Sequence, residues 1–111
     1  MCTIGMIENK NNSDNVSSQA RVRSPKLSVI IVNYNGGDYI KDAVRSLSLQ
    51  SYRDFEVIIL DNASTDGSVD CLDLSDLPAS QLIRNEENLG FAAANNLGAR
   101  LATGHWLVLL N

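Results

Sequence analysis

Residues 57–68 read "VIILDNASTDGS", and this stretch decides the fold. Its first four residues are apolar, and they are followed directly by a polar group: Asp61, Asn62, Ser64, Thr65 and Asp66. A continuous apolar run is typical of a strand covered on both faces, as in a parallel sheet. We therefore expect a buried strand over about residues 55–60, which provides a rigid base for the polar loop after it.

The sequence before this strand predicts a second strand and a helix. Residues 27–32, "LSVIIV", form another continuous run rich in β-branched residues. The loop after it leads to apolar residues at the spacing of an amphipathic helix, with Asp38 as the expected N-cap. Those residues are Ile40, Ala43, Val44 and Leu47. A further short helix is expected near residues 68–74, capped by Ser64 or Asp66.

The sequence after it predicts two more strands around a helix. Pro78 precedes a weaker strand, "QLIR", at residues 81–84. Residues 91–102, "FAAANNLGARLA", predict a helix of small residues that lies close to a sheet. Gly98 within it costs about 1 kcal/mol relative to alanine, which close packing would justify. "HWLVLL" at residues 105–110 is the fourth expected strand.

Strands that alternate with helices predict a parallel sheet with right-handed crossovers. The expected fold class is therefore α/β, a three-layer α/β/α arrangement with a mainly parallel, Rossmann-like sheet. Because that sheet ends at its fourth strand, apolar surface around residues 106–110 is expected to be uncovered. Each expected strand ends in, or is followed by, a carboxylate or carboxamide: Asn33, Asp61, Asn85 and Asn111. In a parallel sheet these side chains share one edge, where open α/β sheets bind ligands.

The rest of the composition limits the domain organisation and the partners. Residues 1–26 are polar without an apolar period and predict a flexible leader, so that the domain spans residues 27–111. The net charge of −4 lacks the basic footprint of a nucleic-acid-binding protein. No apolar run approaches the roughly 18 residues that a transmembrane helix requires. Cys2 and Cys71 are far apart and lack metal-ligand spacing, which favours reduced thiols and a cytoplasmic location.

The loop after the first strand, "NYNGGDY", contains neither a dinucleotide fingerprint nor a P-loop. Apart from Arg84, no strand end carries a cation, so a phosphate ligand would need a divalent ion between it and the protein. Tyr34 offers an aromatic face, and Asp61 offers an acceptor for an N–H or a hydroxyl group. Together they suggest a nucleoside pocket, although composition alone does not choose a nucleoside over a sugar or an amino acid.

Two blocks of this sequence carry a family resemblance. Residues 28–68, which end in "ILDNASTDGS", and residues 85–111, "NEENLGFAAANNLGARLATGHWLVLLN", resemble the N-terminal half of a family 2 glycosyltransferase of the rhamnosyltransferase-like branch. The resemblance implies a GT-A fold and sugar transfer from a UDP- or dTDP-linked donor. The implied acceptor is a saccharide or a lipid-linked saccharide in cell-surface polysaccharide synthesis. A full-length member would be cytoplasmic or peripheral at the inner membrane face.

The resemblance also assigns residues to the donor nucleotide. It implies that Val32, Asn33 and Tyr34 pack on the base, that Asp61 hydrogen-bonds it, and that Asn62 shapes the loop. Asn88 and Gly90, with Phe91 and Asn95, would line the donor cleft. Asn111 would hold the first position of a D-x-D-like motif for Mg²⁺ or Mn²⁺. The second acidic residue of that motif and the catalytic base are not in the sequence, so we expect a donor-binding half that has no catalytic residue and is inactive alone.

Other interpretations of the same residues stay open. Asn62, Ser64, Thr65 and Asp66 also suit turns and helix caps, and Asn88 and Asn95 suit turns and helix packing. A nucleotidyltransferase would need a basic loop after the first strand, which "NYNGGDY" lacks. A non-catalytic receiver-like α/β module would need a lysine at a later strand end, and none is present.

Overall fold

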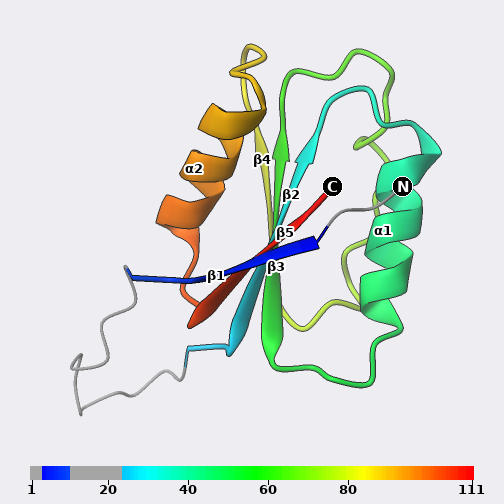
Figure 1. The fold of residues 1–111 in the computed structure, drawn as a ribbon. Helices are drawn as coiled ribbons and strands as arrows, with labels where there is room; N and C mark the ends of the chain where they lie inside the picture. Colours follow the sequence, from blue (N-terminus) through cyan, green and yellow to red (C-terminus); the bar gives the residue numbers. More distant parts are fainter. Residues whose placement is uncertain (1–3, 11–23) are drawn as a thin grey trace.

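The computed structural model describes residues 4–10 and 24–111, which form one five-stranded sheet with a helix on each face (Figure 1). The elements in chain order are β1 (Ile4–Glu8), β2 (Leu27–Asn33), α1 (Asp38–Ser48), β3 (Phe55–Asp61), β4 (Ser80–Arg84), α2 (Phe91–Leu101) and β5 (Trp106–Leu110). The strand order in the sheet is β1-β5-β2-β3-β4. All neighbours run parallel except β1, which is antiparallel to β5. The predicted α/β/α fold with a mainly parallel sheet is confirmed.

The two faces of the sheet are buried by different helices. Helix α1 packs Ile40 and Val44 against one face, where side chains of β2, β3 and β5 alternate into the core. Helix α2 packs Ala94 against the other face, over Ile30 and Leu60. Residues 57–60 are completely buried, which agrees with a central strand covered on both sides.

Helix α2 lies so close to the sheet that Gly98 has no room for a side chain. A Cβ atom there would be 2.7 Å from Cγ2 of Ile30 and 2.9 Å from Cδ2 of Leu60. The close packing that the sequence predicted for Gly98 is therefore confirmed. The same packing brings the N-terminus of α2 beside the carboxyl ends of β2 and β3 (Figure 1).

The prediction of a flexible leader is wrong for residues 4–9. Strand β1 pairs with β5 along its whole length, from Ile4 opposite Leu110 to Glu8 opposite Trp106. Asn9 is 4% exposed, and its Nδ2 donates to the carbonyls of Ala102 (3.3 Å) and Gly104 (2.8 Å). No periodic pattern marks β1 in the sequence, because it is an edge strand whose apolar side chains remain exposed. Residues 1–3 and 11–23 of the expected leader lie outside the described residues.

Strand β1 also overturns the predicted exposure of the last strand. The outer edge of β5 is covered, and Leu107 and Val108 are buried in the two cores. Trp106 at its start is 37% exposed.

Two local predictions between the strands are wrong. Residues 68–71 form a hydrogen-bonded turn and not a helix, with the Asp70 N–H donating to the Gly67 carbonyl at 3.1 Å. Oδ1 of Asp66 accepts the Ser68 N–H (2.9 Å), as an N-cap would, but a single turn of helix is marginal because its first hydrogen bond must fix several residues at once. The N-cap of α1 is Gly37, with φ +54°, while Asp38 is the first helical residue. No helix in the described part of the chain is long and apolar enough to cross a membrane.

Candidate functional site at the carboxyl edge of the sheet

The candidate site lies where β2 and β3 end side by side. Asn33 is the register partner of Asp61, and Asp61 is also the partner of Arg84 at the end of β4. The chain runs from β2 to β3 on one side and later returns to β5 on the other side. Strand order therefore reverses at β2, and the carboxyl ends of β2 and β5 flank the crevice where such sheets bind ligands.

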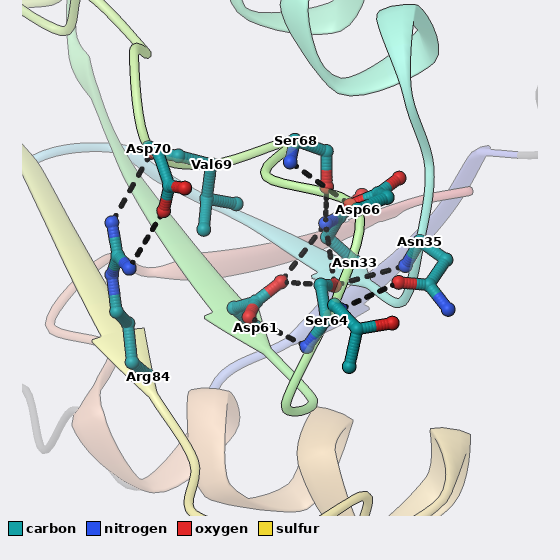
Figure 2. Close-up of polar contacts among 10 residues, drawn as sticks. Asn33, Asn35, Asp61, Ser64, Asp66, Ser68, Val69, Asp70 and Arg84 are labelled. Atoms are coloured by element: carbon teal, nitrogen blue, oxygen red, sulfur yellow. Dashed lines mark hydrogen bonds and ion pairs between the residues drawn. The ribbon is translucent and has the colours of Figure 1, made fainter.

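The ends of β2 and β3 are joined by a buried polar network (Figure 2). Nδ2 of Asn33 donates to Oδ1 of Asp61 (2.9 Å), with the Ser64 hydroxyl (3.2 Å) and the Ser68 hydroxyl (2.9 Å) as further acceptors. Asp61 in turn accepts the Ser64 hydroxyl at Oδ1 (2.7 Å) and the Ser64 N–H at Oδ2 (3.1 Å). Asn33 and Asp61 are 5% and 3% exposed, so the polar atoms of both side chains depend on hydrogen bonds within this network.

The same two loops are joined a second time nearer the solvent. The Asn35 N–H donates to the Ser64 hydroxyl (2.9 Å), and the Thr65 N–H donates to Oδ1 of Asn35 (2.8 Å). The Gly37 N–H donates to Oδ2 of Asp66 (3.0 Å). Hydrogen bonds from the Ser68 hydroxyl and backbone N–H, and then from the Gly37 N–H, hold the pKa of the Asp66 carboxyl below its usual value. Sequence reasoning assigned Ser64 and Asp66 to local turns and missed these long-range bonds, since spacing along the chain carries no signal for them.

A second cluster joins the loop after β4 to the loop after β3. Asn62 is 1% exposed; its Oδ1 accepts from Nδ2 of Asn85 (2.9 Å), and its Nδ2 donates to the Gly90 carbonyl (3.2 Å). The Gly90 N–H donates to Oδ1 of Asn88 (2.9 Å). Gly90 has φ +86° and is the N-cap of α2, so this cluster fixes the start of that helix.

The structure thus links five of the predicted site residues in two connected clusters: Asn33, Asp61, Asn62, Asn88 and Gly90. Tyr34 is 54% exposed beside Asn33, and Asn111 is exposed after the end of β5. Val32 is half-buried on the face that packs against α2. Asn95 is buried and donates to the Phe91 carbonyl within its own helix. The contact of these residues with a ligand stays a prediction.

The described residues do not form a metal site by themselves. None of their His, Cys, Asp and Glu side chains gather in a group of three that could hold an ion. Asn111 supplies a single amide at the expected position. Arg84, the cation at a strand end, is paired with Asp70 at 3.0 Å, as Figure 2 shows.

Comparisons with known proteins agree with this fold. The model of the glycosyl transferase family 2 matches residues 28–111. The putative teichuronic acid biosynthesis glycosyltransferase TuaG of Bacillus subtilis is 38% identical over 89 residues, which are 78% of this chain and 35% of that protein. An uncharacterized glycosyltransferase of Haemophilus influenzae is 38% identical over 77% of this chain and 28% of that protein. This chain thus spans about a third or less of these relatives.

Two solved structures share the fold. S. aureus TarS superposes with a TM-score of 0.66 and 29% identity, covering 74% of this chain and 15% of that chain. The mannosyltransferase PcManGT of Pyrobaculum calidifontis, in complex with GDP-Man and Mn²⁺, gives a TM-score of 0.59 and 30% identity, covering 73% and 25%. The expected glycosyltransferase fold is confirmed by these neighbours. Since the family model matches most of the sequence, the chain belongs to the glycosyl transferase family 2.

Proposed function

We propose that this chain is the donor-nucleotide-binding portion of a glycosyltransferase. The donor is a UDP- or dTDP-linked sugar, and the acceptor is a saccharide or lipid-linked saccharide in cell-surface polysaccharide synthesis. Family membership supports sugar transfer, and the name of the B. subtilis relative supports a cell-surface polymer. The PcManGT complex contains a nucleotide-sugar and a divalent cation. Assignment to the rhamnosyltransferase-like branch and a cytoplasmic or membrane-peripheral location belong to the same proposal.

One observation carries the proposal. Tyr34 exposes its ring at the point where strand order reverses, and both of its neighbours in sequence are held by hydrogen bonds. An exposed aromatic ring on a fixed backbone is a stacking surface that loses little conformational freedom when a ligand binds. The acidic edge around it suits the N–H and hydroxyl groups of a nucleoside.

The other residues take supporting positions. Oδ2 of Asp61 accepts only the Ser64 N–H among the described donors, so its second lone pair is assigned to an N–H of the base. Asn62 holds the loop, and Val32, Asn33, Asn88 and Gly90 line the nucleotide. A hydrogen bond to a charged acceptor contributes about 1.5–3 kcal/mol, which is enough to select ligands that carry the donor.

Catalysis is assigned to the complete enzyme and not to this chain. The described residues do not complete a metal site by themselves. We propose that the chain alone binds nucleotide weakly and releases no free sugar or nucleoside diphosphate from UDP-glucose above background. A nucleotidyltransferase gains no support, because Arg84 is paired with Asp70 and lies away from the loop after β2. A receiver-like module gains none, because β3, β4 and β5 end in Asp61, Arg84 and Leu110 and not in a lysine.

The proposal is tested by binding of UDP, dTDP and GDP to the wild-type chain and to two tyrosine variants. Tyr34→Ala removes the proposed stacking surface, and Tyr39→Ala removes a tyrosine that is 84% exposed on α1. We expect isothermal titration to give about tenfold weaker binding for Tyr34→Ala and no change for Tyr39→Ala. Equal affinities of the two variants, or no binding of any of the three nucleotides at millimolar concentration, would refute the proposal.

A further inference from the structure

Three hydrogen bonds between the loops after β2 and β3 form what we call the inter-loop clasp. It consists of Asn35 and Gly37 in the first loop and Ser64, Thr65 and Asp66 in the second. Figure 2 shows Asn35, Ser64 and Asp66 of this set. Each loop supplies backbone donors to side-chain acceptors of the other, so neither loop is held by its own bonds alone. None of these five residues was predicted to be part of the site.

Asp66 does more in the clasp than a turn requires. Its Oδ1 accepts the Ser68 N–H (2.9 Å), an ordinary local turn bond, while its Oδ2 accepts the Gly37 N–H across the gap (3.0 Å). Asp73 provides the comparison within the same chain. Its Oδ1 accepts both the Ser75 N–H (3.0 Å) and the Ser75 hydroxyl (2.6 Å), and these contacts remain local. The second oxygen of Asp66 is thus the part of this motif that reaches another element.

The loop that the clasp holds has a backbone shape that a free chain seldom adopts. Asn35 has φ +49° and Gly37 has φ +54°, both in the left-handed region. For an L-residue this region is disfavoured, although asparagine tolerates it better than most. External hydrogen bonds to Asn35 and Gly37 therefore select this shape from the many that the loop could otherwise take.

We propose that Asp66, together with Asn35, is a positioning residue that presents Tyr34 to the nucleotide. Asn33, the residue before Tyr34, is fixed by the buried network. The clasp fixes Asn35 and Gly37, the first and third residues after it. Tyr34 itself is 54% exposed, so packing in the core does not fix its position. This inference rests on the proposed nucleotide site and adds that the loop is preorganised for it by residues that do not touch the ligand.

If the clasp preorganises the loop, its removal should change the free energy of nucleotide binding more than the free energy of unfolding. If the clasp is removed, the loop must be ordered when the ligand binds. Ordering even one backbone residue lowers affinity by about tenfold. Because Asp66 is exposed, its removal should affect folding about as little as removal of Asp73.

The test compares Asp66→Ala, Asp66→Asn and the matched control Asp73→Ala in the full chain. The measurements are the affinity for UDP and dTDP, the melting temperature, and ¹⁵N relaxation with amide exchange at residues 34–37. We expect Asp66→Ala to bind about tenfold more weakly than Asp73→Ala at a similar melting temperature, with a mobile 34–37 segment. Asp66→Asn keeps one carbonyl acceptor and should fall between Asp66→Ala and wild type.

The outcomes separate this inference from the proposed function. Equal affinity and equal order of residues 34–37 in Asp66→Ala and Asp73→Ala would overturn the clasp while leaving the nucleotide site intact. If wild type binds neither nucleotide, the proposed function fails. The positioning inference is then tested by hydrogen exchange of the Gly37 amide, whose protection should be lost in Asp66→Ala and kept in Asp73→Ala. Unchanged protection from exchange in Asp66→Ala would overturn the inference.

Discussion

Replacing Asn33 by aspartate should be far more harmful than replacing it by alanine, although aspartate is nearly identical in shape. The Nδ2 atom of Asn33 is 2.9 Å from Oδ1 of Asp61, and both residues are more than nine-tenths buried. Asn33→Ala removes a hydrogen bond to the Asp61 carboxylate, which costs about 1.5–3 kcal/mol, while Oδ1 of Asp61 keeps the Ser64 hydroxyl as a donor. Asn33→Asp removes the same donor and also places two carboxylates in contact.

The additional cost can be worked out in two ways. Unit charges about 4 Å apart repel by about 4 kcal/mol at an effective dielectric constant of about 20. Protonating one carboxyl group at pH 7 also costs about 4 kcal/mol, since an ordinary carboxyl pKa lies about three units lower. Asn33→Asp should therefore be less stable than Asn33→Ala by up to about 4 kcal/mol at pH 7. That is a large share of the 5–15 kcal/mol typical of a domain.

Urea unfolding of wild type and both variants at pH 7 and pH 4.5 measures this difference. The folded Asn33→Asp protein binds more protons than its unfolded chain, so its free energy of unfolding should rise as the pH falls. At pH 4.5 a protonated carboxyl can donate to Asp61, and the gap to Asn33→Ala should close. Equal stabilities of the two variants at pH 7, or equal pH dependence, would show that Asn33 and Asp61 are not the buried pair described here.

Three further predictions concern other parts of the molecule. Gly98→Ala should lower the melting temperature, because overpacking against Ile30 costs about 1–3 kcal/mol and exceeds the gain in helix propensity of about 1 kcal/mol. The control Asn96→Ala, on the exposed side of α2, should raise the melting temperature slightly. A higher melting temperature for Gly98→Ala would contradict the close packing. Asn9→Ala should destabilise by about 1–3 kcal/mol in urea and speed amide exchange along β1, and unchanged exchange there would mean that Asn9 does not anchor the strand. Hydrogen bonds lower the pKa of Asp66 below the ordinary 3.8, so its bond to the Gly37 N–H persists at neutral pH and is lost only as the pH falls below 3.8. An NMR titration of the Gly37 amide should therefore have a midpoint below 3.8 in wild type and none in Asp66→Asn, and a midpoint above 3.8 would contradict this.

The central part of the fold was predictable because apolar patterning reports burial. Strands β2 and β3 are covered on both faces and read as continuous apolar runs, and Gly98 marks the close approach of α2. Strand β1 was not predictable, because an edge strand with exposed side chains has no periodic signal. Its pairing with β5 depends on backbone hydrogen bonds and on Asn9, far away in sequence.

The candidate site was predictable in its location and not in its internal bonding. Parallel strands must end at one edge, so Asn33 and Asp61 were expected to meet there, and they do. The spacing of Ser64 and Asp66 suggested caps for a helix, yet the structure has a turn at residues 68–71 and long-range bonds to the loop after β2. Local spacing cannot distinguish a cap from a contact between loops, because both use the same short polar side chains.

Amide chemical-shift mapping with UDP and dTDP in the presence of Mg²⁺ tests the central claim most directly. The account predicts that the shifted resonances cluster at residues 33–37, 61–66 and 88–91, with Tyr34 among the largest changes. Shifts confined to another surface, such as the groove between α1 and residues 71–76, would contradict it, as would unchanged spectra at millimolar nucleotide.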